Sequence, residues 1–210
     1  MGLTTAELST IDHLVSERRK VARGDALFCS GDHFTAIYAV KLGFFKTEVL
    51  SEDGRHQVTS FYMAGEVLGM DGISAETQHC DAIALEDSEV CLIPFNQLES
   101  VSLKVPTLQR HLHRVLSREI VRDQGMMMML GAMRAEERVI AFLLNLSQRY
   151  VARGYAAADF NLRMTREEIG SYLGLKLETV SRAFSHLQEE GLVQVDKKRI
   201  RLMDTAKLNK

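Results

Sequence analysis

Three polar side chains near the end of the chain have types and spacing suited to reading DNA. Glu178, Ser181 and Arg182 lie three and four residues apart, so on a helix they project from one face. The carboxylate accepts a hydrogen bond from cytosine, the hydroxyl contacts more than one base, and the guanidinium donates two hydrogen bonds to guanine. We interpret them as base-reading residues. The alternative is that Glu178 and Arg182 form only a surface ion pair.

Two predicted helices would present these side chains. Thr165 and Glu168 have the spacing of a capping box, so a helix is expected to begin at Arg166 and to end at Gly174. A second amphipathic helix follows, and its apolar face contains Val180, Ala183, Phe184 and Leu187. After Gly191, the segments LVQV and RIRL are expected to form two strands around a basic turn. This order of elements predicts a winged helix-turn-helix.

Basic residues are concentrated at this end of the chain. Residues 161–210 contain 10 Lys and Arg against 7 Asp and Glu, a net charge of +3, whereas the whole chain carries −2. Local positive charge favours contact with DNA phosphates. We expect Lys197, Lys198 and Arg199 of the turn, and Lys176 before the second helix, to hold phosphates without reading sequence.

The preceding part of the chain predicts a β-rich domain followed by helices. Residues 3–18 have the apolar spacing of a helix. Residues 19–94 contain short strand-like runs separated by glycine turns, which indicate an antiparallel barrel or jelly roll, with a hairpin at Asp53-Gly54. A short helix is expected over 95–101, a longer one from Pro106 to about Arg134, and a further one over 135–154.

The longer helix has a largely apolar seam with alternating spacings of three and four residues, over about two and a half heptads. This seam favours pairing with a second copy, and packing against the chain's own β-domain is the alternative. Its acidic residue would face a like charge across a parallel dimer axis, so we expect pairing to be weak and adjustable. The seam consists of His113, Leu116, Ile120, Asp123, Met127 and Leu130.

Composition narrows the remaining possibilities. The 210 residues are 46% hydrophobic and 26% charged, as in ordinary globular proteins. Neither a membrane span nor a signal peptide is evident, so we expect a cytoplasmic protein without a membrane partner. His33, His56 and His79 lie in separate expected loops, which disfavours the metal site of a cupin-like enzyme. No enzymatic activity is therefore expected.

The order of β-barrel, seam helix and winged helix-turn-helix resembles the CRP/FNR superfamily of bacterial transcription regulators. The motif Glu178-Thr179-Val180-Ser181-Arg182 and the segments MAGEVLGMDGI, LEDSEVCLIPF and AEERVIAFLLNLS are similar to its FNR branch. The resemblance implies an α+β fold in three parts. These are a cyclic-nucleotide-binding-like β-barrel (jelly roll) in residues 1–104, a dimerisation helix in 105–134, and a winged helix-turn-helix DNA-binding domain in 135–210.

Two features separate the chain from the cyclic-nucleotide branch of that superfamily. Leu177 and Ser181 occupy positions at which the recognition helix resembles the FNR pattern rather than the CRP pattern. Between Gly65 and Ala84 there is no Lys or Arg to pair with a cyclic phosphate, and a buried anion without a partner is costly. Cyclic AMP is therefore not expected as the effector.

The FNR resemblance implies oxygen sensing by a [4Fe–4S] cluster. Cys91 matches the family's internal ligand, whereas Cys29 and Cys80 have no match, and the family's cysteine-rich segment is absent from the chain as written. Because such a cluster takes four thiolates, we expect no cofactor in the chain as given and a cluster only in a full-length protein. We interpret Met1-Gly2 as marking a shortened regulator, with Asp123 as the acidic seam residue of the family.

The resemblance also implies how the protein acts. It would bind double-stranded DNA as a homodimer at a palindromic site with TTGAT-like half-sites, about one helical turn apart. It would act as an activator of genes under oxygen limitation and contact RNA polymerase through the hairpin around Gly54. The alternatives are a regulator that responds to heme, a small effector or redox state, or a clusterless constitutive form.

Overall fold

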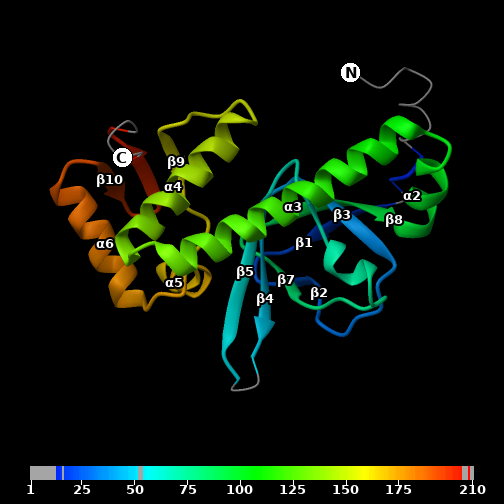
Figure 1. Cartoon of the computed structure of the whole chain (residues 1–210), viewed down its shortest axis with the longest axis horizontal. Helices are drawn as coiled ribbons and strands as arrows, with labels where there is room; N and C mark the ends of the chain where they lie inside the picture. The colour runs from blue at the N-terminus through cyan, green and yellow to red at the C-terminus, as the bar shows by residue number, and fades with distance from the viewer. Residues whose placement is uncertain (1–12, 16, 52–53, 205–207, 209–210) are drawn as a thin grey trace. The chain divides into compact units, whose positions relative to one another are not determined.

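The computed structural model of the chain describes residues 13–15, 17–51, 54–204 and 208. It divides into two compact units, Met1–Gln124 and Gly125–Lys210, and the division falls within the long helix α3 (Pro106–Ala132) (Figure 1). The predicted α+β class is confirmed, with a β-rich first unit and a mainly helical second unit. In the described part of the chain, no helix is long and apolar enough to cross a membrane.

The first unit contains two four-stranded antiparallel sheets, with strand orders β1-β8-β3-β6 and β2-β7-β4-β5. Among the described residues of this unit, the helical elements are the 3-10 helix η1 (Met70–Ile73), the helix α2 (Phe95–Ser102) and the first part of α3. The strands are β1 (Glu17–Val21), β2 (Ala26–Phe28), β3 (Ala36–Leu42), β4 (Phe44–Leu50), β5 (His56–Met63), β6 (Val67–Leu68), β7 (Asp81–Ala84) and β8 (Ser88–Pro94).

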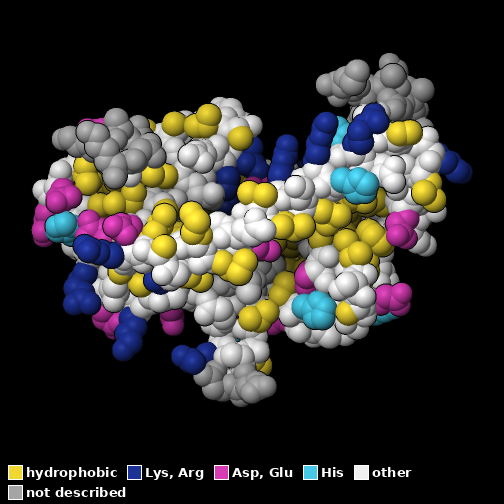
Figure 2. All heavy atoms as spheres, viewed as in Figure 1, with side chains coloured by type: hydrophobic (Ala, Val, Ile, Leu, Met, Phe, Trp, Pro, Cys, Tyr) yellow, Lys and Arg dark blue, Asp and Glu magenta, His cyan; other side chains and the backbone are white. Residues whose placement is uncertain are grey.

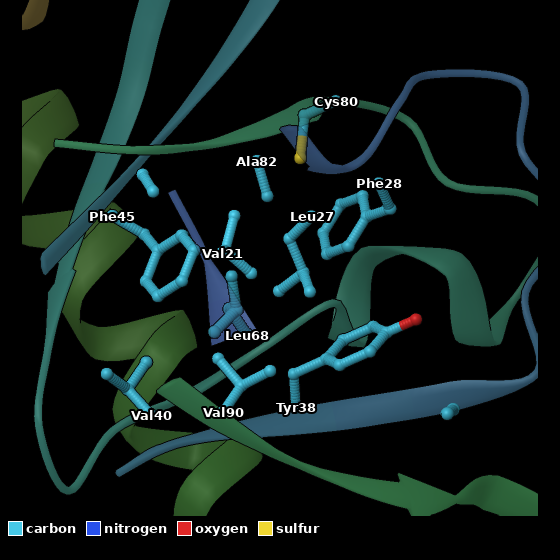
Figure 3. Close-up of a cluster of buried hydrophobic side chains, with 12 residues drawn as sticks. Val21, Leu27, Phe28, Tyr38, Val40, Phe45, Leu68, Cys80, Ala82 and Val90 are labelled. Atoms are coloured by element: carbon cyan, nitrogen blue, oxygen red, sulfur yellow. The ribbon is translucent and has the colours of Figure 1, made fainter. Parts of the chain in front are cut away.

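Apolar side chains from both sheets fill the space between them. Phe45, Leu68 and Val90 come from three different strands and are fully buried, and Figure 3 shows them with Tyr38 and Val40 directed toward one another. Removing each such side chain from water contributes about 1.5–3 kcal/mol. This packing holds the two sheets together as the predicted β-barrel domain.

The predicted helix over residues 3–18 is wrong at its end. Residues 3–12 and 16 lie outside the described residues, and Glu17 begins β1. In β1, Glu17 pairs with Leu92 and Val21 with Ser88 of β8. Pairing with a strand more than 60 residues away determines the extended conformation here, so it overrides the local helical periodicity.

The hairpin and the three helices predicted after it are confirmed. β4 and β5 pair from Phe44 with Met63 to Leu50 with His56, and Gly54 in the connection has a φ of 81°. The helices at 95–101, from Pro106 and from residue 135 appear as α2, α3 and α4 (Ala135–Val151). Each carries a strong local pattern, because its apolar residues recur at helical spacing.

The second unit contains α4, the two helices of the predicted helix-turn-helix and a small sheet with the strand order β10-β11-β9. The helices are α5 (Arg166–Leu173) and α6 (Leu177–Glu189), and the strands are β9 (Asp159–Asn161), β10 (Val193–Asp196) and β11 (Arg199–Leu202). The third strand, β9, was not predicted. The fully buried large apolar residues among the described residues of this unit are Val139, Leu143, Leu146, Ile169, Leu173, Val180, Leu187 and Ile200.

Candidate nucleic-acid interface

Helix α5 begins and ends as the sequence predicts. Thr165 Oγ1 accepts a hydrogen bond from Glu168 N (3.1 Å), and Glu168 Oε2 accepts one from Thr165 N (2.7 Å), which completes the capping box. Gly174 ends the helix in the left-handed conformation, with a φ of 64°. Gly170 is equally constrained, because a Cβ there would lie 2.6 Å from Leu175 O. The turn can therefore place α6 close against α5.

Helix α6 presents the proposed base-reading residues to solvent. Val180, Ala183, Phe184 and Leu187 are its buried residues, whereas Glu178, Ser181 and Arg182 are all exposed. Among the residues that the structure describes, Glu178 and Arg182 form no ion pair with each other. The geometry therefore leaves both side chains available to a ligand in the first turns of the helix, where a recognition helix contacts bases.

Arg166, which the sequence analysis did not identify, packs against the buried face of α6. Its guanidinium carbon lies 3.2 Å from the centroid of the Phe184 ring, a cation–π contact. Burial lowers the pKa of Arg166 to about 10. Within the described residues its Nη1 is buried and has no hydrogen-bond partner. This contact connects the first turn of α5 to the buried face of α6.

Side-chain hydrogen bonds from Arg138 connect α4 to the ends of the neighbouring helices. From α4 its side chain donates to three backbone carbonyls, those of Leu130 (2.7 Å), Met133 (3.0 Å) and Leu173 (3.1 Å). Leu130 and Leu173 lie in the last turns of α3 and α5, where a helix leaves acceptors unpaired, and Met133 directly follows α3. Arg138 is therefore a positioning residue, and its role could not be found from local sequence because Leu173 lies 35 residues away.

The basic turn between β10 and β11 is a two-residue hairpin connection. Asp196 pairs with Arg199, which leaves Lys197 and Lys198 at the turn, and both side chains are exposed. Lys197 adopts a positive φ of 54°, which is uncommon for a residue with a side chain. Lys176 is likewise exposed, at the N-cap of α6, and its side chain forms no capping bond. All three lysines remain suited to phosphate contact.

Arg199 differs from the lysines because it already has an acidic partner. Its Nε and Nη2 donate to the two carboxylate oxygens of Asp159 at 2.8 and 2.7 Å, and Arg201 also donates to Asp159. The hydrogen bond from Arg199, followed by that from Arg201, lowers the pKa of Asp159 to about 2. The predicted phosphate contact by Arg199 would therefore compete with an ion pair across β9 and β11.

Basic side chains project from the part of the surface over α6. Figure 2 shows dark-blue Lys and Arg groups at its lower left, where Figure 1 places α6. Acidic groups are interspersed, consistent with the modest charge excess of residues 161–210. A surface of this kind provides phosphate attraction, while discrimination between sequences has to come from base contacts.

The seam residues lie along α3 with a largely exposed apolar stripe. Ile120 is 58% exposed, Met127 65% and Leu130 37%, and Figure 2 shows yellow side chains along this helix. Asp123 and His113 are exposed, and Leu116 is half-buried. Contiguous apolar side chains on a surface are typical of a protein interface.

The three cysteines do not fit a four-thiolate cluster. Cys91 lies half-buried on β8, Cys29 is exposed, and Cys80 is buried with its Sγ donating to Asp71 Oδ2 at 3.4 Å. Burial, with the adjacent Asp71 carboxylate, raises the pKa of Cys80 and favours the neutral thiol. Among the described residues, no cysteine belongs to a group of three possible metal ligands. A [4Fe–4S] cluster needs four thiolates.

Comparison with known proteins identifies both parts of the chain. Residues 18–104 match the family model of the cyclic nucleotide-binding domain, and residues 137–210 match that of the Crp-like helix-turn-helix domain. The solved structure of FixK2 from Bradyrhizobium japonicum aligns with a TM-score of 0.85 and 30% identity, over 93% of this chain and 96% of that one.

Curated relatives match along nearly the whole chain. The transcriptional regulatory protein btr of Bordetella pertussis is 47% identical over 97% of this chain and 84% of its own length. The transcriptional activator protein anr of Pseudomonas aeruginosa is 41% identical over 99% and 85%, and the anaerobic regulatory protein of Pasteurella multocida is 42% identical over 98% and 76%. The chain is thus a DNA-binding transcription regulator and not an enzyme, and it belongs to the FNR branch of the CRP/FNR family.

Proposed function

We propose that the protein binds palindromic DNA with TTGAT-like half-sites and reads them with the exposed face of α6. The presentation of Glu178, Ser181 and Arg182 at the start of that helix supports this proposal most directly. Arg182 donates two hydrogen bonds to guanine, Glu178 accepts from a cytosine amino group, and Ser181 contacts a neighbouring thymine. Lys176, Lys197 and Lys198 hold phosphates.

A binding measurement with matched duplexes tests this proposal. Fluorescence anisotropy at one fixed salt concentration compares a duplex with two TTGAT half-sites and a duplex of the same composition with scrambled half-sites. We expect the first to bind at least about a thousandfold more tightly, as is usual for specific DNA binding. Equal affinity for the two duplexes would rule out sequence reading by α6.

The same proposal requires two copies of α6, and the stripe along α3 supports a homodimer. The large exposed apolar side chains Ile120 and Met127 become buried if two α3 helices pair. Asp123, exposed between them, then opposes its counterpart and weakens the pair. Sedimentation equilibrium over a range of protein concentrations measures this association directly.

We further propose that the protein activates genes under oxygen limitation. The names of the relatives, an activator and an anaerobic regulatory protein, support this assignment. Cys91 matches the family's internal ligand, but the cysteines present cannot complete a cluster, so sensing through [4Fe–4S] belongs to a protein with further ligands. Anaerobic reconstitution of this chain with iron and sulfide should give no stable cluster absorption, and a stoichiometric cluster would contradict the ligand argument.

The hairpin around Gly54 is proposed as the contact with RNA polymerase. It connects β4 and β5, and the glycine adopts a positive φ of 81° that few other residues tolerate. In a reconstituted transcription assay, Gly54→Val should reduce activation while leaving DNA binding unchanged. A parallel loss of DNA affinity would point to misfolding of the β-domain instead.

A further inference from the structure

A group of charged side chains spans three neighbouring strands of the first unit. β4 lies between β7 and β5 in its sheet (Figure 1). Glu48 of β4 is directly opposite Asp81 of β7, and Leu50, two residues further along β4, is opposite His56 of β5. Since side chains two residues apart share a face, Glu48, Asp81 and His56 lie on one face of the sheet. One ligand atom from each lies within 4.8 Å of the others.

This arrangement has an excess of negative charge. Glu48 is only 6% exposed, and a carboxylate directly opposite it on the adjacent strand is unfavourable. Lys46 Nζ contacts Glu48 Oε2 at 2.7 Å and compensates one of the two charges. A cation bound between Glu48 and Asp81 would neutralise the second carboxylate charge.

The types of these three side chains are suited to bind a transition-metal ion. We propose that Glu48, His56 and Asp81 form a binding site for one divalent ion such as Zn²⁺, with water as the fourth ligand. Two carboxylates and an imidazole suit Zn²⁺, whose bonds to oxygen and nitrogen are about 2.0–2.2 Å long. Tetrahedral ligands at that length lie roughly 3.4 Å apart. His56 Nδ1 and Glu48 Oε1 are 3.1 Å apart, so this pair already has nearly the required separation.

Neighbouring groups hold both carboxylates in place, as is usual for metal ligands. Lys46 bonds the distal oxygen of Glu48 and leaves Oε1 toward His56. Ser30 N donates to Asp81 Oδ1 at 2.7 Å. The His56 side chain is 55% exposed, which gives an ion access from solvent. A bound ion would connect the turn end of the β4–β5 hairpin, at Glu48 and His56, to Asp81 of β7.

A second cluster in the other unit provides a matched control. Glu136, His186 and Glu190 also lie within 4.8 Å of one another, but all three are partly or fully exposed. His186 already contacts Glu136 through Nδ1 (3.0 Å) and Glu190 through Nε2 (3.6 Å). Because both ring nitrogens are engaged by carboxylates and neither carboxylate is buried, this group is explained as a surface ion-pair network.

Titration with metal alone tests the proposed site. The full chain is stripped with a chelator and titrated with Co²⁺, followed by visible absorption, and then with Zn²⁺ as competitor. We expect one equivalent of Co²⁺ per chain, with ligand-field bands and without the sulfur-to-metal charge transfer of cysteine ligands. His56→Gln and Asp81→Asn should each weaken binding at least about tenfold, since even supporting residues of metal sites have effects of that size.

Substitutions in each of the two clusters show which cluster binds the ion. Circular dichroism shows whether each variant folds, and Asp81→Asn retains the oxygen that accepts from Ser30. His186→Gln should leave Co²⁺ binding unchanged. The proposal is overturned if no ion binds, if the spectrum shows thiolate ligands, if His56→Gln and Asp81→Asn bind as the wild type does, or if His186→Gln abolishes binding.

Discussion

Replacement of Arg182 by alanine should remove the preference for guanine in each half-site and leave the fold intact. The side chain is exposed, whereas α6 is held by the neighbouring buried residues Val180, Ala183 and Phe184. Surface substitutions of this kind change the free energy of unfolding by less than about 0.5 kcal/mol. The effect on DNA binding can therefore be measured without interference from unfolding.

The expected loss of DNA affinity follows from the Arg182–guanine contact, which a dimer makes twice. A bidentate Arg–guanine contact contributes about 1–3 kcal/mol of discrimination. A dimer on a palindrome makes two such contacts, and well-separated contacts are roughly additive. Arg182→Ala should therefore cost about 2–6 kcal/mol on the cognate duplex, which is at least about 30-fold in affinity.

A cycle of protein and DNA substitutions measures this coupling. Anisotropy titrations combine wild type and Arg182→Ala with the TTGAT palindrome and with a palindrome whose half-site guanine is replaced. Arg182→Ala should lose affinity only for the first duplex. Lys198→Ala is the control, since loss of a phosphate contact weakens both duplexes equally and reduces the salt dependence by about one per contact. If Arg182→Ala weakened both duplexes equally, Arg182 would be a phosphate contact and the base-reading argument would fail.

Three further substitutions test other parts of the structure. Asp123→Ala removes a like-charge repulsion of roughly 1 kcal/mol and should shift sedimentation profiles toward dimer several-fold, whereas an unchanged profile would exclude the seam. Thr165→Ala removes the cap of α5 and should cost about 1 kcal/mol, lowering the Tm of the DNA-binding unit by about 4–8 °C, with Thr165→Ser as the conservative control. The hydrogen bond to Glu136 raises the pKa of His186. The interaction between the protonated His186 and Glu136 therefore stabilises the folded state fully below about pH 6.5, and this stabilisation is lost as the pH rises through the raised pKa. Glu136→Gln should flatten the dependence of urea stability on pH in that range, and a persistent slope would assign it to another group.

The helix-turn-helix could be predicted because its signals are local. The capping box of Thr165 and Glu168, the left-handed Gly174 and the apolar face around Val180 each involve residues within one or two turns. The hairpin at Gly54 is local in the same sense. Local hydrogen bonds and side-chain periodicity specify such elements before any long-range contact forms.

Two strands could not be predicted in this way. β1 begins at Glu17, inside the segment 3–18 whose apolar spacing indicates a helix, and β9 has only three residues. Each exists because a distant strand supplies its hydrogen bonds: β8 for β1, and β11 for β9. The segment's own sequence therefore does not reveal the free energy that pairing with a distant strand contributes.

The sequence by itself determined which residues face outward from α6, because helical spacing separates its polar residues Glu178 and Arg182 from its apolar ones. Only the tertiary structure decided which charges meet. It pairs Arg199 with Asp159 40 residues earlier, and it places Asp81 opposite Glu48. The physical reason is that charge interactions depend on distance in space, and strand register, rather than separation along the chain, sets that distance.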